Sequence, residues 1–466
     1  MKMNTIPLIV FLLTLLACGE KPLGPAGGNG STPSTPATPA ASEKAGEPLS
    51  AWQEGQMDIH FINTTTGECV FVIAPDGTQI LIDAAGSLVS TGQVNSSVTN
   101  TGIRARWDPT KDPDYRTGKF IAGYLAKCMA WTGNDKIDYV VNTHFHNDHF
   151  GGYSKSLPVS DKSDTYRKQS LPEILDTYPV GTLLDRGWPD YMYPYDVRKL
   201  ASNGDAIDNY VKAVQWHAAH TGLKAARFVA GSKDQVVLKR KAAAYPSFVF
   251  RNIAVNGEIW DGGQTTTATA TFPAASEIQV ANPADPGNAD KCPAENHCSC
   301  VMKISYGAFD FFEGGDAQYN GMSSFPWKDM ETPVAKAAGA VEVMKADHHG
   351  VTNTNGSGFT SSVTGKTAEA MRYLRPRCWI VNSWTDGHPR QPVYEGVMGT
   401  MPGTDAYITN VCDAMGSYAE FSRVKGSNGH IVVRVYDGGA TYRVYVLSDS
   451  DGKMTVKSIS NAYKSV

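Results

Sequence analysis

The feature that most constrains this chain is a cluster of metal-binding side chains directly after a predicted strand. Ile137–Asn142 is an apolar run with the length of a buried strand, and it leads into His144, His146, Asp148 and His149. Three imidazoles and a carboxylate so close together are hard to explain as core or surface residues, and both groups are common metal ligands. If the chain turns after the strand, His144 and His146 face one ion, while Asp148 and His149 face a second. The sequence therefore predicts a two-metal site.

The rest of the chain alternates between strand-like and helix-like segments, which predicts an α/β fold. Short apolar runs between turn residues indicate strands, and apolar residues at helical spacing indicate helices. The predicted strands are 57–62, 69–74, 79–83, 137–142, 235–238, 248–255, 300–306, 309–312, 378–381, 430–436 and 442–447, and the predicted helices are 120–131, 204–220 and 332–343. Asp437-Gly438-Gly439 predicts a hairpin between the last two strands.

The first residues have the features of a bacterial export signal. Residues 6–17 form an apolar run that is too short to span a bilayer and has the length of a signal-peptide core. Leu15-Leu16-Ala17-Cys18 resembles a bacterial lipobox, in which the cysteine carries the lipid. Residues 19–56 are rich in Gly, Pro, Ser, Thr and Ala, which predicts a flexible linker. We expect a signal peptide at 1–18 and a lipid anchor on Cys18; the alternative is a plain signal peptide.

The lipid anchor implies a location in the bacterial cell envelope. Gly19, directly after the cysteine, resembles the pattern of lipoproteins sorted to the outer membrane. We therefore expect the protein to be attached to a membrane through its lipid, on the outer membrane or facing the periplasm.

Seven cysteines follow Cys18, and an exported protein can form disulfides. Cys292, Cys298 and Cys300 lie close together, near His297. A zinc knuckle is one interpretation, but the ligands lack the usual paired spacing. We expect one local disulfide and a spare thiol.

The H-x-H-x-D-H pattern of residues 144–149 resembles the signature of the metallo-β-lactamase fold superfamily. Asp83 at a strand end, Asp316 after Glu313-Gly-Gly, and His349 before Gly350 match further segments of that pattern in order. The resemblance covers residues 57 to about 392. It implies a four-layer αββα sandwich with insertions.

This resemblance also implies a division of the chain. The metallo-β-lactamase fold domain is expected at 57–400, with an insertion at about 153–290 where the pattern is less regular. The strands predicted within 401–466 are expected to pack on this domain or to extend it.

The resemblance further implies a metal-dependent hydrolase with two divalent ions, zinc or alternatively manganese. The implied ligands are His144, His146, Asp148, His149, Asp316 and His349, with Asp316 shared by both ions. A hydroxide held between the ions is then the nucleophile, and Asp148 also steers it. His348 either protonates the leaving group or supports its neighbour His349.

One branch of the superfamily matches better than the others. The segments 300–316 and 345–350 are similar to the hydrolase domain of DNA-uptake competence proteins and to bacterial phosphorylcholine esterases, which implies phosphodiester substrates. Residues 65–68 depart from the Gly-Gln-Gly-Asp turn of that branch. The classical third histidine of the first metal has no clear match, since His217, His220 and His297 are the only histidines in that interval. The third ligand of the first metal stays open.

Four further side chains lie outside this set of ligands. His217 and His220 are expected on a solvated helix face. His388 either lies near the site or belongs to a plain turn, and Arg186 either binds an anionic substrate or belongs to a turn, which we favour.

The net charge of −4 argues against long nucleic acid as substrate. We expect a small-molecule or envelope-polymer ester, with phosphodiesters first. The alternatives are a β-lactam, lactone or thioester hydrolase and, in a different class, a non-catalytic cell-surface binding protein.

Overall fold

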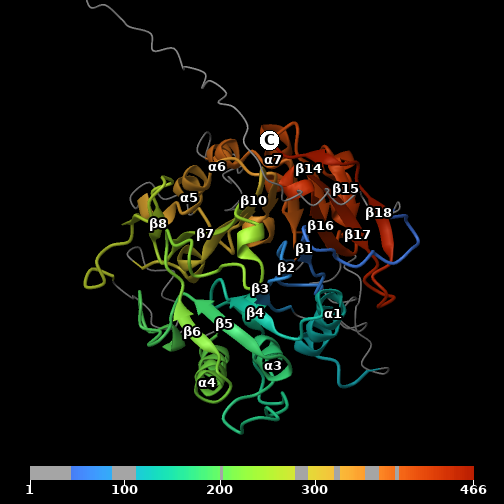
Figure 1. The fold of residues 1–466 in the computed structure, drawn as a ribbon. Helices are drawn as coiled ribbons and strands as arrows, with labels where there is room; N and C mark the ends of the chain where they lie inside the picture. Colours follow the sequence, from blue (N-terminus) through green and yellow to red (C-terminus); the bar gives the residue numbers. More distant parts are fainter. Residues whose placement is uncertain are drawn as a thin grey trace, which may run out of the picture. The chain divides into compact units, whose positions relative to one another are not determined.

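Two large β-sheets carry most of the chain in the computed structural model (Figure 1). The structure describes residues 43–86, 112–199, 203–278, 292–319, 326–351, 367–383 and 388–466, all within the compact unit 37–466. The predicted signal peptide, Cys18 and the first part of the linker lie outside the described residues.

The first sheet has the order β18-β17-β16-β1-β2-β3-β4-β5-β6, and β19 pairs with β17. Its strands are β1 (Met57–Phe61), β2 (Cys69–Ile73), β3 (Gln79–Ala84), β4 (Ile137–Val141), β5 (Val180–Asp185), β6 (Lys224–Arg227), β16 (His430–Tyr436), β17 (Thr441–Leu447), β18 (Val456–Ile459) and β19 (Tyr463–Lys464). The first three predicted strands form the antiparallel pairs β1–β2 and β2–β3, and the β16–β17 pair confirms the predicted hairpin.

The second sheet has the order β15-β14-β13-β12-β11-β10-β7-β8-β9. Its strands are β7 (Phe248–Val255), β8 (Glu258–Trp260), β9 (Ala268–Ala270), β10 (Val301–Tyr306), β11 (Phe309–Glu313), β12 (Val343–Lys345), β13 (Cys378–Val381), β14 (Asp405–Ile408) and β15 (Val424–Ser427). The strands β11 to β15 run parallel to one another, so their carboxyl ends share one edge.

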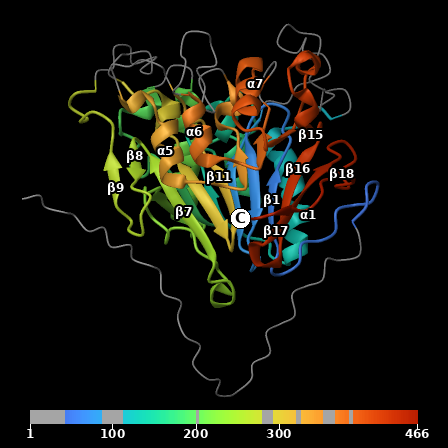
Figure 2. The ribbon, with the colours of Figure 1, turned by 90° about the horizontal axis from the view of Figure 1, so that it is seen from above.

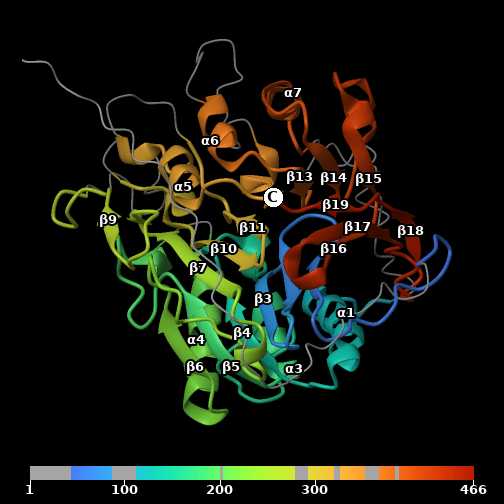
Figure 3. The same ribbon diagram turned by 45° about the horizontal axis from the view of Figure 1, so that its top comes forward.

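Helices cover the outer face of each sheet, which gives the expected four layers. The helices are α1 (Thr117–Thr132), α2 (Asn147–Phe150), α3 (Ser170–Thr177), α4 (Gly204–His220), α5 (Glu331–Ala338), α6 (Thr367–Leu374) and α7 (Gln391–Thr400). Figures 1 and 3 show α1, α3 and α4 on one side of the strands and α5, α6 and α7 on the other, and Figure 2 shows the second group from above. The predicted αββα sandwich is confirmed.

Three apolar cores hold the layers together. On β1, Met57, Ile59 and Phe61 point between the sheets, as the period of two of a strand requires. The outer faces pack separately, with Leu125 of α1 in one core and Val334 of α5 in the other. Each sheet is therefore apolar on both faces, which explains why its central strands are continuous apolar runs.

The region 153–290 is more regular than the sequence pattern suggested. It supplies β5 and β6, which extend the first sheet parallel to β4, and β7 to β9, which form one end of the second. The predicted helix 204–220 and strand 248–255 are confirmed, whereas 235–238 is not a strand. The described part of this region thus belongs largely to the sandwich and not to an insertion.

The ordered chain begins before Met57, unlike our expectation. Gly46 N donates to Val456 O at 2.8 Å, and Leu49 N donates to Met454 O at 3.0 Å. Leu49 and Trp52 are buried against the outer face of the first sheet. These two apolar side chains fix the end of a segment whose overall composition is typical of a linker.

The predicted local disulfide does not form. All seven cysteines after Cys18 are buried and free. Cys298 packs into the outer core of the second sheet, whereas Cys300 packs between the sheets. The two side chains therefore point in opposite directions.

Within the described ranges, no helix is long and apolar enough to cross a membrane.

Candidate metal centre

The first donor group lies in the loop after β4. His144 is fully buried and His146 is half-buried, with His144 Nε2 3.1 Å from His146 Nδ1. His144 Nε2 also lies 3.5 Å from Oδ2 of Asp316, which follows β11 in the other sheet. The strand ends of two sheets thus bring two imidazoles and one carboxylate together.

The second donor group combines Asp148 and His149 with Asp316 and His349. Nε2 of His149 lies 3.1 Å from Asp316 Oδ1 and 4.0 Å from Asp148 Oδ2, and Nε2 of His349 lies 3.0 Å from Asp148 Oδ2. In each group the donor atoms all lie within 4.8 Å of one another. Asp316 belongs to both groups, so the six side chains named from the sequence lie together.

The donor atoms fit two cations. Atoms bound about 2.0–2.1 Å from a tetrahedral ion lie about 3.3 Å apart, close to the separations found here. Both Asp316 carboxylate oxygens and His149 Nε2 are buried, and the 3.1 Å approach between His149 Nε2 and Asp316 Oδ1 lacks the geometry of a hydrogen bond. Buried polar atoms without partners are costly, which favours an ion as their partner.

The electrostatics of the site also favour cations. Burial opposes protonation of His149 and His349. Nearby carboxylates, Asp316 foremost, nevertheless raise the pKa of His149 above its usual range and that of His349 to about 10. The buried carboxylates thus create a strong negative potential, which bound cations would balance.

A scan against family models agrees with this geometry. Residues 131–223 match the model described as "Metallo-beta-lactamase superfamily". The chain contains a metallo-β-lactamase superfamily domain. Proteins of this superfamily typically bind divalent metals and are usually hydrolases. A comparison with curated proteins gives no match. The matched range includes His144 to His149, whereas Asp316 and His349 lie beyond it.

Asp83 orients one histidine of the metallo-β-lactamase domain. Its Oδ2 lies 2.7 Å from His149 Nδ1, and its two oxygens accept hydrogen bonds from Thr143 N (2.7 Å) and Oγ1 (2.6 Å). A carboxylate on the far nitrogen of a metal-binding histidine fixes the ring and increases its basicity. The position of Asp83 agrees with its expected place near the metal loop.

Glu68 has a similar position at the other histidine, which the sequence did not predict. Its Oε1 lies 3.1 Å from His349 Nδ1 and 3.2 Å from Lys345 Nζ. The preceding residue, Gly67, lets the backbone pass close to the metal loop, because a Cβ at Gly67 would lie 2.9 Å from the backbone oxygen of Asp148. In the sequence, residues 65–68 stand out only because they depart from the Gly-Gln-Gly-Asp turn of the similar branch.

His348 lies beside the first donor group. Its Nε2 is 3.7 Å from Asp316 Oδ2, and its side chain keeps 17% exposure. Asn296 Nδ2 lies 3.2 Å from His348 Nδ1. Burial lowers the pKa of His348 to about 4, so the ring is neutral at pH 7. His348 thus lies next to the donor that both groups share, and the first group contains no third histidine among the described residues.

Arg186 is buried in an ion pair with Glu295 that holds the metal loop. It is fully buried, its Nε donates to Glu295 Oε1 at 2.7 Å, and the same oxygen accepts a hydrogen bond from Phe145 N at 2.7 Å. Phe145 lies between His144 and His146. This ion pair therefore ties the backbone of the loop to the segment that carries Asn296, a link that sequence reasoning missed.

The remaining histidines differ in their burial and in their distance from the site. His217 is buried, with Nε2 3.1 Å from Asp176 Oδ1, so the expected solvated face is wrong for it; His220 is exposed, as expected. The ring of His388 lies 6.4 Å from that of His349, which places it near the site.

Proposed function

We propose that this domain is a hydrolase that uses two divalent metal ions, zinc or manganese, to cleave phosphodiesters. The observation that carries the proposal is the position of Asp316, whose oxygens face His144 on one side and His149 on the other. When bound, two ions so placed lower the pKa of a water molecule and stabilise the attacking and leaving oxygens of an in-line displacement.

The protein side chains have separate tasks in this reaction. One carboxylate oxygen of Asp148 lies 3.0 Å from Nε2 of His349. Burial by itself would raise the pKa of Asp148, but the nearby histidines have the larger combined effect and lower it. It therefore stays ionised, and we assign it the orientation of the attacking water. His348 is neutral and partly exposed, so its N–H can donate a hydrogen bond to a substrate oxygen on the leaving side.

Two features favour phosphodiesters over β-lactams. The first donor group contains His144, His146 and the shared Asp316 with no third histidine among the described residues, whereas classical β-lactamases use that histidine at the first metal. The segments 300–316 and 345–350 are similar to the phosphodiester-cleaving branch. The net charge of −4 favours a small phosphodiester or a phosphocholine-type group over long nucleic acid.

A substrate screen tests this proposal. Bis-p-nitrophenyl phosphate, p-nitrophenyl phosphorylcholine, nitrocefin and a lactone are compared at equal enzyme with added zinc or manganese. Phosphodiester turnover should be fastest, Asp148→Ala should abolish it, and Arg372→Gln, at an exposed position of α6, should retain it. Nitrocefin turnover about tenfold faster than phosphodiester turnover, a barrier difference of about 1.4 kcal/mol, would reverse the ranking. No turnover of any ester would favour the non-catalytic binder.

We also propose that Cys18 carries a lipid that holds the domain at the cell envelope. The support is the apolar run, the lipobox-like segment and the linker composition. Cys18→Ala should release the protein from membranes or block its maturation. If the variant fractionates with membranes as the wild type does, the anchor is wrong.

A further inference from the structure

A cavity lies at the end of the first sheet that is opposite the metal loops. It has a volume of about 700 Å³ and is lined by the segment 43–56, the β16–β17 hairpin and residues 459–462. β1 runs in the same direction as β3, because each is antiparallel to β2. The cavity lies at the start of β1, where Met57 pairs with Val435, while the metal loops follow the ends of β3 and β4. None of the metal donors lines it.

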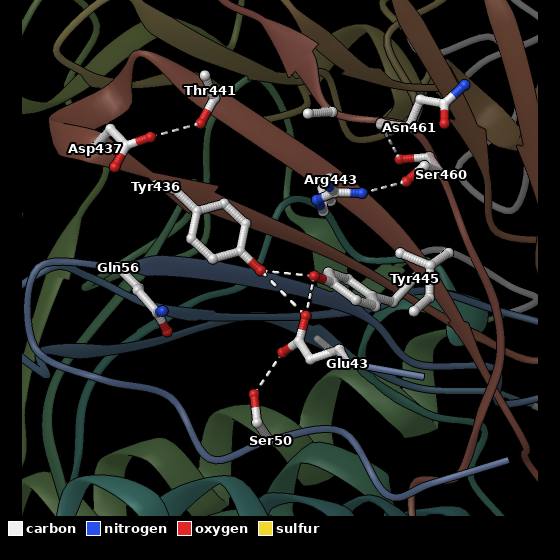
Figure 4. A pocket seen from close by; sticks show the side chains of 12 residues that line it. Glu43, Ser50, Gln56, Tyr436, Asp437, Thr441, Arg443, Tyr445, Ser460 and Asn461 are labelled. Atoms are coloured by element: carbon white, nitrogen blue, oxygen red, sulfur yellow. Dashed lines mark hydrogen bonds between the residues drawn. The ribbon is translucent and has the colours of Figure 1, made fainter. Parts of the chain in front are cut away.

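The base of this cavity is a rigid polar cluster around Glu43. Figure 4 shows the hydroxyls of Tyr436 and Tyr445 turned toward the Glu43 carboxylate. Tyr436 Oη lies 2.6 Å from Tyr445 Oη, and Arg434 Nη1 donates to Glu43 Oε1 at 2.8 Å. Ser50 donates to the same carboxylate. Every member has a partner, so the two tyrosine rings are held in place before any ligand arrives.

The walls carry polar groups with unused hydrogen-bonding capacity. Arg443 is half-buried and donates to Ser460 O at 2.9 Å, which uses one of its five N–H groups. The exposed side-chain amide of Asn461 has no hydrogen-bond partner among the described residues. Figure 4 shows Asn461 and Ser460 on the same side of the cavity as Arg443, across from Gln56. Donors and acceptors thus face the cavity from both sides.

The charge of this region is close to balanced. Arg434 pairs with Asp58 at 2.7 Å and with Glu43, while Arg443 and Asp437 carry opposite charges on the rim. An anion would meet the carboxylates of Glu43 and Asp437, and a cation would meet Arg443. An uncharged ligand with many hydroxyl groups avoids both of these like-charge repulsions.

We propose that this cavity binds an uncharged oligosaccharide. Its volume lies within the range of about 300–1,000 Å³ that is typical of small-molecule sites. Tyr436 is half-buried, and a tyrosine ring supplies a flat apolar surface that suits the face of a sugar ring. Tyr445 is fully buried and serves only to hold Tyr436 and Glu43 in place. The amides and the guanidinium match the mixed donors and acceptors of sugar hydroxyls. The site uses no metal donor, so it is independent of the proposed hydrolase function.

The test measures binding without turnover. The full chain carrying Asp148→Ala is titrated by calorimetry with chitotetraose, maltotetraose and a sialylated trisaccharide, all at millimolar concentration. We expect a neutral oligosaccharide to bind, and Arg443→Gln or Asn461→Ala to weaken it about fivefold, the size expected for one lost hydrogen bond. Arg372→Gln, a matched exposed arginine on α6, should bind as before. Thermal unfolding shows whether each variant is folded.

Each other outcome overturns the proposal. Absence of binding by both neutral sugars, preferential binding of the sialylated sugar, or binding that Arg443→Gln and Asn461→Ala leave unchanged would each show that this cavity is not an oligosaccharide site. A failure here leaves the metal centre untouched, since the readout does not depend on hydrolysis.

Discussion

Asp83 and His149 connect the first sheet to the metal loop. Asp83 Oδ2 lies 2.7 Å from His149 Nδ1, while the opposite nitrogen of the same ring lies 3.1 Å from Asp316 Oδ1. One carboxylate therefore orients the ring so that its other nitrogen faces the donor shared by both groups.

We expect Asp83→Asn to weaken metal binding about 10- to 100-fold, because carboxylate partners of ligand histidines have effects of this size. Competition with a chromophoric chelator measures the affinity. Asp234→Asn, at an exposed position on a loop, is the matched control. Equal affinity of Asp83→Asn and wild type would contradict the role of Asp83.

Glu68 is expected to matter for stability as well as for the site. Glu68→Gln removes the charge beside Lys345 Nζ, which is buried with 1% of its side chain exposed. Breaking a buried ion pair at one partner costs about 3–5 kcal/mol, whereas an exposed pair contributes about 0–1 kcal/mol. Glu313, 3.2 Å from the same Nζ, can reduce the loss.

The matched control for Glu68→Gln is Glu54→Gln, whose partner Lys241 is exposed. The free energy of unfolding in urea is compared between the two variants. A loss for Glu68→Gln no larger than that for Glu54→Gln would show that the buried network is unimportant.

The burial of His297 should make the protein less stable as the pH falls. Burial lowers its pKa from 6.5 to about 3 in the folded protein. Below pH 6.5 the unfolded chain gains a proton that the folded chain excludes, so stability falls as the pH decreases toward 3. This group alone contributes a slope of about 1.4 kcal/mol per pH unit.

Between about pH 7 and about pH 5, the wild type should therefore lose about 1–2 kcal/mol more unfolding free energy than His297→Gln. His220→Gln, at an exposed histidine of α4, should lose as much as the wild type. Parallel pH profiles for the wild type and His297→Gln would exclude this effect.

The metal donors could be predicted from the sequence because their signal is local. Four of them lie within residues 144–149, whereas Asp316 and His349 depend on the resemblance to the family. Asp316 comes after the predicted strand 309–312, but His349 comes after β12, where the apolar pattern predicted the end of the helix 332–343. Their supporting residues could not be found this way. Glu68 reaches His349, and Glu295 reaches Phe145, only through the pairing of two sheets, which leaves no spacing in the sequence.

Two segments differ from what their composition and pattern predict. The segment before Met57 has the average composition of a linker, yet Leu49 and Trp52 pack it onto the sheet. Residues 153–290 lack a clear period because irregular segments lie between their short strands and helices, although β5, β6 and β7 belong to the sandwich.

Metal content measured together with activity tests the account most directly. Protein purified without chelator should contain about two metal ions per chain, and activity of the stripped protein on bis-p-nitrophenyl phosphate should rise until about two equivalents are added. Asp316→Ala should lower the metal content and abolish turnover, because it removes the donor shared by both groups. Metal-free wild-type protein with full hydrolytic activity would contradict the account.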